Sequence, residues 1–205
     1  MKRLKIVLLS VACLFPFVCL AQQTLPDAPA PQTAKRTRAL PAYTPPTQAE
    51  RFRTYVKHTF GVSSILEAGV RGGIEQATDN PDEWPQGAQG YADRFGSAMG
   101  QIAIRGTTEY LVADIFREDL RFRPCGDDCN KFSAALKDTF LARKGEDGHQ
   151  TFSVARLVGP WSGSAVAVNT WYPAGDKDNS QIVRQAMFGY GFQFIRNYIR
   201  EVRGH

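Results

Sequence analysis

The sequence predicts a mainly α-helical fold, a single bundle whose helices make close contacts through small residues. Apolar residues recur at spacings of three and four along several segments, which is the period of an amphipathic helix. No long segment shows the sustained alternation of a half-buried strand. Glycine and alanine also recur at four-residue spacing in three separate segments, which is typical of helices that pack at short distance.

The longest patterned run predicts a helix over residues 88–118, against which the other elements are expected to pack. Its apolar stripe is expected to face the core and comprises Phe95, Met99, Ile102, Gly106, Ala113 and Phe116. A stripe of small residues lies beside it, and two other segments share its spacing. Because a glycine inside a helix costs about 1 kcal/mol relative to alanine, we expect helix contacts at Gly69, Gly73, Gly96, Gly100, Gly159 and Gly163.

A first helix is expected to begin at Thr47, which forms a capping-box pattern with Glu50, and to break near Gly61. After this break the apolar residues are expected to pack inward. Glu67 and Arg71 lie four positions apart and are expected to pair in solvent.

The remaining segments predict a loop over 77–87, a helix over 131–143, a helix from Pro160 to Trp171, and a last helix over 181–202. The last helix is nearly apolar all round. Its polar strip comprises Gln193, Arg196, Asn197 and Arg200. We therefore expect this helix to be largely buried or to face lipid.

The amino terminus has the composition of a secretory signal peptide over residues 1–21, with basic residues, an apolar run and a small residue before a polar segment. An uncleaved membrane anchor is the alternative. Residues 22–48 are rich in proline and alanine and predict a linker, which leaves 49–205 as one helical domain. These features predict export to the periplasm or an association with the outer membrane.

The charge balance argues against nucleic-acid binding. The chain has 25 basic and 20 acidic residues, but residues 1–48 contain six of the basic and one of the acidic residues. Residues 49–205 are therefore neutral, with 19 of each. A neutral domain lacks the electrostatic attraction to phosphate backbones that nucleic-acid binding requires.

A weak candidate polar site follows the long helix and comprises Asp114, Glu118, Asp119 and Arg121. By angle, Asp114 shares the small-residue face, so we expect a buried carboxylate that forms a structural ion pair with Arg121 or Arg156. The alternative interpretation is an acid and arginine pocket that performs hydrolysis.

Cys125 and Cys129 are the cysteines that remain after removal of the signal peptide. In an exported protein such a pair predicts a disulfide. A zinc site is the alternative, but no histidine lies nearby, so no metal is expected. The sequence also contains no phosphate loop, dinucleotide fingerprint or nucleophile elbow, so no cofactor is expected.

Four motifs resemble an uncharacterised family of exported helical bacterial proteins: EWPQGAQGYADRFG, REDLRF, ALKDTFLAR and WYPA. The resemblance covers roughly residues 60–180 and implies a helical exported protein with no known activity. The family usually has a histidine-containing acid-Pro-Arg-Tyr motif where this chain has Glu118-Asp119-Leu120-Arg121-Phe122. The histidine that would support catalysis there is absent.

Together these features predict a non-enzymatic protein of the cell envelope that binds a protein or lipid partner through an apolar surface. A hydrolase-like enzyme with a site at Asp114, Asp119 and Arg121 is one alternative, and a membrane-inserted bundle is another. The sequence leaves the small-molecule ligand and the oligomeric state open.

Overall fold

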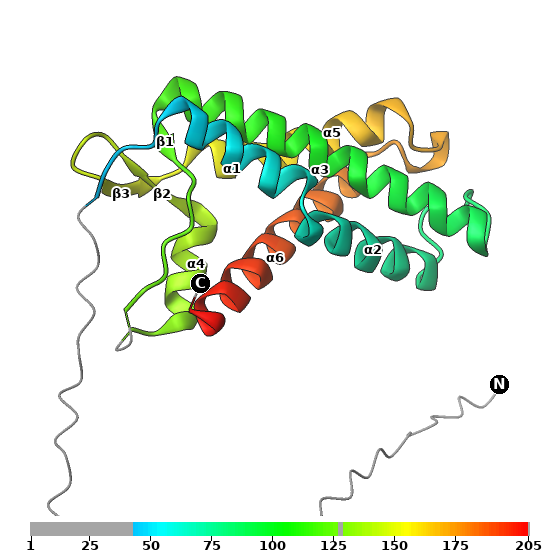
Figure 1. Cartoon of the computed structure of the whole chain (residues 1–205). Coiled ribbons are helices and arrows are strands. Elements are labelled where there is room, and N and C mark those ends of the chain that lie inside the picture. The colour runs from blue at the N-terminus through cyan, green and yellow to red at the C-terminus, as the bar shows by residue number, and fades with distance from the viewer. Residues whose placement is uncertain (1–42, 127–128, 205) are drawn as a thin grey trace, which may run out of the picture. The chain divides into compact units, whose positions relative to one another are not determined.

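A computed structural model describes residues 43–126 and 129–204 as helices with one small sheet (Figure 1). The signal peptide and residues 22–42 of the expected linker lie outside the described residues, so both stay predictions. Tyr43 and Thr44, at the end of the expected linker, contact the domain: Thr44 accepts a hydrogen bond from Arg121 at 2.6 Å, and the Tyr43 ring lies 5.0 Å from the Arg123 guanidinium.

The predicted mainly α-helical bundle is confirmed. The helices are α1 (Gln48–Phe60), α2 (Val62–Ala77), α3 (Ala88–Phe116), α4 (Lys131–Phe140), α5 (Val154–Thr170) and α6 (Asn179–Arg203), with a short 3-10 helix η1 (Ala174–Asp176) before α6. The strands are β1 (Glu118–Asp119), β2 (Leu141–Lys144) and β3 (His149–Phe152). The capping box of Thr47 and Glu50 starts α1, and the expected break falls at Gly61.

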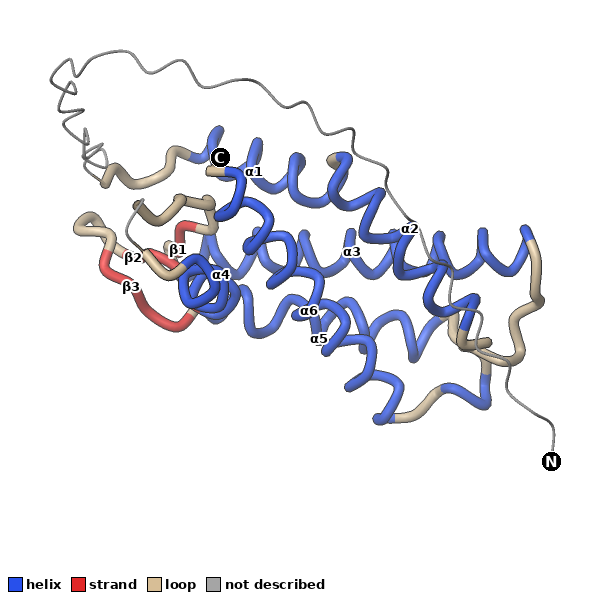
Figure 2. Tube along the Cα trace, turned by 90° about the horizontal axis from the view of Figure 1, so that it is seen from below, coloured by secondary structure: helices blue, strands red, loops and turns tan. Residues whose placement is uncertain are grey.

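The long helix α3 is the centre of the bundle. It packs against α5 on one side and against α1 and α2 on another, while α6 packs against α4 and α5 (Figures 1 and 2). The loop between α2 and α3 is held by Arg94 of α3, whose side chain is fully buried. Its guanidinium donates hydrogen bonds to the carbonyl oxygens of Asn80, Pro81 and Pro85 at 2.7–3.0 Å.

The strands and one helix boundary differ from the sequence predictions. Residues 141–144 continue the helical spacing of α4 but form β2, which pairs antiparallel with β3 across a turn and with β1 on its other edge. The turn has two glycines at positive φ, Gly145 and Gly148. The helix predicted from Pro160 instead begins at Val154, because Ser153 caps it and the Pro160 ring packs over Gly189 of α6.

Close helix contacts occur at some of the predicted glycines. A Cβ atom at Gly163 would lie 2.6 Å from the carbonyl oxygen of Gln101, so α5 and α3 approach too closely there for any larger residue. Gly159 similarly lies against the Glu109 side chain. A Cβ atom at Gly100 would lie 3.3 Å from the Trp171 ring.

The prediction is wrong for Gly73 and Gly96, where no atom lies within 4 Å of the position of an added Cβ. Both glycines lie on helix faces that point away from the neighbouring helices. A Cβ atom at Gly69 would meet the Tyr91 hydroxyl at 3.4 Å, an ordinary van der Waals distance. The close approach of α2 to α3 occurs at Gly72, where an added Cβ would lie 3.1 Å from the backbone nitrogen of Phe95.

The orientation of α2 is the reverse of the predicted one. Glu67, Arg71 and Glu75 point inward and are each at most 6% exposed. The large apolar residues of α2 point outward, with Val62 73% and Leu66 63% exposed. All charged residues of this helix therefore lie inside the bundle, and its outer face is apolar.

The same reversal occurs in α6. Its buried face is mainly polar and comprises Gln181, Gln185, Ala186, Gly189, Tyr190, Gln193, Asn197 and Glu201. The apolar residues Met187 and Ile195 are 52% and 50% exposed. The predicted polar strip thus faces the interior. Of the two expectations for this helix, the one that it is largely buried is wrong for these apolar residues.

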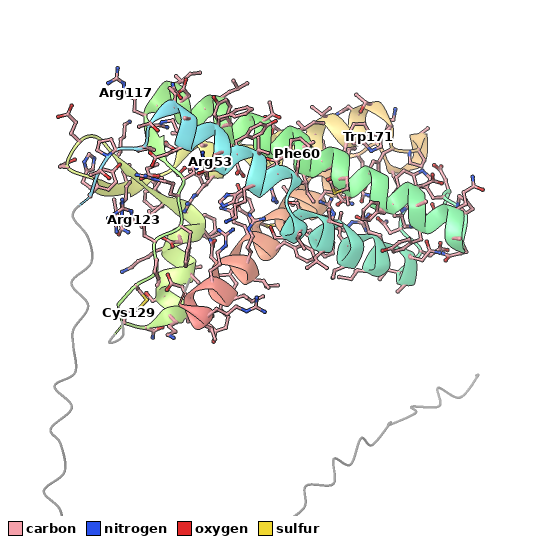
Figure 3. All side chains as sticks on the ribbon, viewed as in Figure 1. Arg53, Phe60, Arg117, Arg123, Cys129 and Trp171 are labelled. Atoms are coloured by element: carbon pink, nitrogen blue, oxygen red, sulfur yellow. A yellow bond between two sulfur atoms is a disulfide. The ribbon has the colours of Figure 1, made fainter. Side chains whose placement is uncertain are left out.

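The outward faces of the bundle are free of charge over much of their length. Arg156 is the one charged residue of α5, and it is buried. No charged residue is exposed on α3 between residues 94 and 113 or on α6 between residues 185 and 202. Exposed charges also lie on α1, at Arg53 and Lys57, and on α4, at Lys131 and Lys137. Others lie toward the two ends of the bundle. Near the loops at one end are Asp79, Asp82, Glu83, Asp93, Lys177, Asp178 and Arg184, and near the sheet at the other are Arg117 and the half-buried Arg123 (Figure 3).

The apolar core is correspondingly small. One cluster joins Ala68, Ala98 and Ile102, and another joins Ala167, Val168 and Tyr172. Arg94 and Gln185 are among the largest fully buried side chains. Within the described part of the chain, no helix combines the length and the hydropathy needed to cross a membrane.

Candidate functional site

The interior of the bundle contains a polar network that joins α2, α3 and α6. Gln185 of α6 donates hydrogen bonds to Glu75 at 3.1 Å and to the Tyr172 hydroxyl at 2.8 Å. Arg71 contacts Glu75 at 3.4 Å and also binds the side chains of Gln101 and Gln185. Burial raises the pKa of Glu75, and burial together with the Glu75 charge raises the pKa of Tyr172 to about 12. These contacts fix the mutual orientation of three helices, and Oε2 of Glu75 stays without a hydrogen-bond partner among the described residues.

A second network is centred on Glu67 of α2. Its two carboxylate oxygens accept from Arg105 of α3 at 3.1 Å and from Arg196 of α6 at 3.2 Å. Desolvation favours the protonated form of Glu67, but the charges of the two arginines outweigh it, so the pKa of Glu67 is lowered. The carboxylate is therefore ionised and connects three helices through two ion pairs.

A cavity lies beside this second network, between α1, α3, α6 and the segment that follows β1. It consists of two adjoining regions of about 50 Å³ and 20 Å³. The regions share His58, Glu109, Leu120 and Arg196. A volume of this size holds several waters or one small ligand group.

The cavity wall is strongly positive. The charged residues of the smaller region are Glu109, Arg156, Arg196 and Arg200. Desolvation and the nearby charges of Arg196 and Arg200 hold the pKa of His58 well below its usual value. Desolvation and the charge of Arg105 lower the pKa of Arg196 to about 10. His58 is therefore neutral at pH 7, and its Nε2 lies 3.2 Å from Nη2 of Arg200.

The structure brings together three of the four predicted polar-site residues. Both carboxylate oxygens of Glu118 are occupied: Oε1 accepts from the backbone nitrogen of Val154 at 2.8 Å, and Oε2 accepts from the Ser153 hydroxyl at 2.5 Å. Glu118 thus caps the start of α5. Asp119 forms a two-oxygen ion pair with Arg121, with a shortest distance of 2.9 Å. The contacts of Glu118 hold the segment after α3 to the start of α5.

The expected burial of Asp114 is wrong. Asp114 is exposed, and its recorded contact is a hydrogen bond from Gln48 at 2.7 Å. It forms no ion pair with Arg121 or Arg156. At this position the small-residue face of α3 points toward solvent. The Asp114 carboxylate is therefore hydrated and does not pack against a neighbouring helix. Arg156 instead donates to the carbonyl oxygens of Leu120 and Leu141, at 3.3 and 2.6 Å.

A separate groove of about 450 Å³ runs between α4, α6 and the segment after β1. Cys125 and Cys129 lie on its wall as a disulfide pair with Cα atoms 6.0 Å apart. The backbone nitrogen of Cys125 donates to Glu201 at 3.0 Å, so the disulfide turn is attached to the end of α6. Desolvation raises the pKa of Asp138, also on this groove, to about 6, although Arg156 opposes the shift.

Asp138 should make stability depend on pH. Because its folded pKa of about 6 lies above the ordinary value of 3.8, the protonated form is favoured in the folded state. Its contribution is fully present below pH 3.8 and is lost as the pH rises through about 6. We expect Asp138→Asn to raise the melting temperature at pH 8 and to change it little at pH 4, measured against Asp93→Asn, an exposed control. An equal effect at both pH values would contradict this assignment.

Sequence reasoning missed the residues that form the interior networks, above all Glu67, Arg105 and Arg196. The spacing placed each of them opposite a face rich in large apolar residues, but it did not show that the polar face is the one that points inward. Within the described ranges, no group of three or more His, Cys, Asp or Glu side chains is arranged to hold a metal ion.

Comparison with known proteins adds no relationship: no family model, curated protein or solved structure matches the chain. The resemblance to an exported helical family therefore stays a prediction based on the four motifs.

Proposed function

We propose that this protein is a non-enzymatic module of the cell envelope that binds the surface of a lipid bilayer through the outer faces of its helices. The single observation that supports this proposal is the outward orientation of the large apolar side chains of α2, α5 and α6. The charged side chains of these helices point inward, apart from Arg184 and Arg203 near the two ends of α6. A helix placed against acyl chains favours this arrangement, since polar groups are then satisfied inside the bundle.

The distribution of the apolar residues favours lipid over a protein partner. A single apolar leucine on a surface is ordinary, whereas a large continuous apolar area marks a binding site. Here the exposed residues include Leu66 of α2, Leu111 of α3, Trp161 of α5 and Met187 of α6. A protein partner would cover one face of the bundle. Acyl chains can cover the apolar side chains of several helices together, and the exposed charges beside them suit the polar headgroup region.

The interior supports a structural rather than a catalytic role. Glu67, Glu118 and Asp119 each have arginine, hydroxyl or backbone partners at hydrogen-bond distance. Carboxylates with these contacts hold helices in place.

Flotation of the exported chain with phosphatidylcholine vesicles tests the proposal, because neutral vesicles isolate the apolar contribution. We expect the wild type to float with the vesicles. The double variant Leu66→Gln and Val70→Gln removes two large apolar side chains from α2, and burial of each is worth about 1.5–3 kcal/mol. We expect at least a tenfold loss of binding, by conversion at about 1.4 kcal/mol per tenfold.

The matched control introduces the same residue type at two exposed positions near the charged end of α3, as Ala88→Gln with Ala92→Gln. This variant should float like the wild type. A wild-type chain that stays in the aqueous fraction, either as a monomer or as a discrete oligomer, would overturn the proposal. Equal flotation of the α2 variant and the wild type would also overturn it.

A further inference from the structure

The cavity between α1, α3 and α6 has a surplus of positive charge that the described residues do not neutralise. Three arginines and one glutamate are the charged residues of its smaller region: Arg156, Arg196, Arg200 and Glu109. Arg196 pairs with Glu67 at 3.2 Å. Among the described residues, neither Arg156 nor Arg200 forms an ion pair with a carboxylate. Arg156 is buried and donates to the carbonyl oxygens of Leu120, Asp138 and Leu141, and Arg200 is half-buried. These contacts leave both guanidinium charges without a carboxylate, which indicates a missing anion at the cavity.

Arg200 is the residue best placed to meet such an anion. Its side chain is held over the Phe122 ring at 5.5 Å, and one of its nitrogens lies 3.2 Å from Nε2 of neutral His58. A planar guanidinium presents five N–H donors in a fork that matches two oxygens of a phosphate or carboxylate. The described contacts of Arg200 use only part of this donor set.

The cavity also contains acceptors that need a donor. Oε1 of Glu109 and Oε1 of Gln193 are buried and have no hydrogen-bond partner among the described residues, although Oε1 of Glu109 lies 3.8 Å from Nε of Arg105, at ion-pair distance. Both residues line the smaller region, together with the arginines. A simple anion would satisfy the arginines alone. An oxyanion that also has a hydroxyl group satisfies the arginines and supplies a donor to these acceptors.

We propose that this cavity binds a phosphate group with an adjacent hydroxyl, as found in a glycerol phosphate or in the headgroup of an anionic glycerophospholipid. Its oxyanion would lie between Arg156, Arg196 and Arg200, and its hydroxyl would donate to Glu109 or Gln193. The lipid form of this ligand rests on the proposed function, whereas the site itself does not. Exposed apolar residues flank the cavity-lining residues on both helices, with Val56 and Phe60 on α1 and Ile195 and Ile199 on α6.

A thermal-unfolding series tests the site in solution. We expect glycerol 3-phosphate to raise the melting temperature of the exported chain by roughly 2–4 °C relative to chloride at equal ionic strength. Sulfate, which has the charge but no hydroxyl, should give a smaller rise. The informative variant is Arg200→Gln, which removes an unpaired cation and so leaves no carboxylate without a partner. Arg203→Gln, an exposed change in the last turn of the same helix, has the same effect on net charge.

If the site binds phosphate, glycerol 3-phosphate should no longer raise the melting temperature of Arg200→Gln. It should still raise the melting temperature of Arg203→Gln. Identical melting temperatures in glycerol phosphate and chloride would overturn the site, and so would a full phosphate effect in Arg200→Gln. Vesicles identify the source of the phosphate. If it is a lipid headgroup, phosphatidylglycerol strengthens wild-type binding over phosphatidylcholine, and Arg200→Gln removes that gain but keeps the phosphatidylcholine binding.

In another outcome, glycerol 3-phosphate raises the melting temperature while phosphatidylglycerol does not strengthen vesicle binding. That result would support the site and assign it to a soluble phosphate ester. The two proposals fail separately. Loss of binding to neutral vesicles contradicts the lipid-binding function, whereas loss of the phosphate effect on melting contradicts the site.

Discussion

Replacing Glu67 with glutamine is expected to lower the free energy of unfolding by about 3–5 kcal/mol, the usual effect of removing one partner from a buried ion pair. Glu67 is 6% exposed and binds Arg105 and Arg196 at 3.1 and 3.2 Å. Glutamine has nearly the same shape, so the change removes the charge and leaves two buried guanidinium groups without their carboxylate. Chemical denaturation followed by circular dichroism measures the loss.

Asp114→Asn is the matched control, because it also converts a carboxylate to an amide. The exposed Asp114 makes its recorded hydrogen bond with Gln48, so its replacement should change stability by no more than about 0.5 kcal/mol. The expectation from sequence was the opposite, with Asp114 as the buried partner of an arginine. Similar losses for the two variants would contradict the structure, because they would remove the distinction between an interior and an exterior carboxylate.

Replacing Gly163 with alanine is expected to lower stability by about 1–3 kcal/mol, within the range of changes that overfill a packed core. The added methyl group would lie 2.6 Å from the carbonyl oxygen of Gln101. That oxygen belongs to the α3 backbone and cannot move aside as a flexible side chain does. The two helices must therefore separate, which weakens the contact between α3 and α5.

Gly96→Ala is the control for this change and should act in the other direction. An added methyl group at Gly96 meets no atom within 4 Å, so the main effect is the gain of up to about 1 kcal/mol from replacing glycine inside a helix. Thermal unfolding of both variants gives the comparison. A loss of stability in Gly96→Ala would indicate that this face contacts another part of the protein.

Periodicity in the sequence was sufficient to predict the helices and several of their ends. The capping box at Thr47 and the break at Gly61 are local signals that depend only on neighbouring residues. Residues 141–144 lacked such a signal, because LARK extends the helical spacing of α4. The strand forms there through pairing with residues 149–152, across the turn at Gly145 and Gly148.

Periodicity could not decide which face of a helix points inward. In α2 the spacing places Leu66 on one face and Glu67 and Arg71 on the opposite face. This pattern is the same whichever of the two faces points into the bundle. The choice depends on partners that lie far away in the sequence, such as Arg105, Arg196 and the cavity-lining residues of α6. The same dependence explains the wrong placement of Asp114. Its environment is set by where α1 and α5 contact α3, which the α3 pattern alone does not specify.

Site-specific labelling of the outer face of α2 tests the central claim most directly. An environment-sensitive fluorophore would be attached at Leu66→Cys, on the apolar face, and at Asp93→Cys, at the charged end of α3. With phosphatidylcholine vesicles, we predict that the label at position 66 shifts to shorter wavelength and is quenched by lipids with a quencher on the acyl chain, while the label at position 93 stays in water. A label at position 66 that remains in water when vesicles are present would contradict the claim that this face lies against lipid.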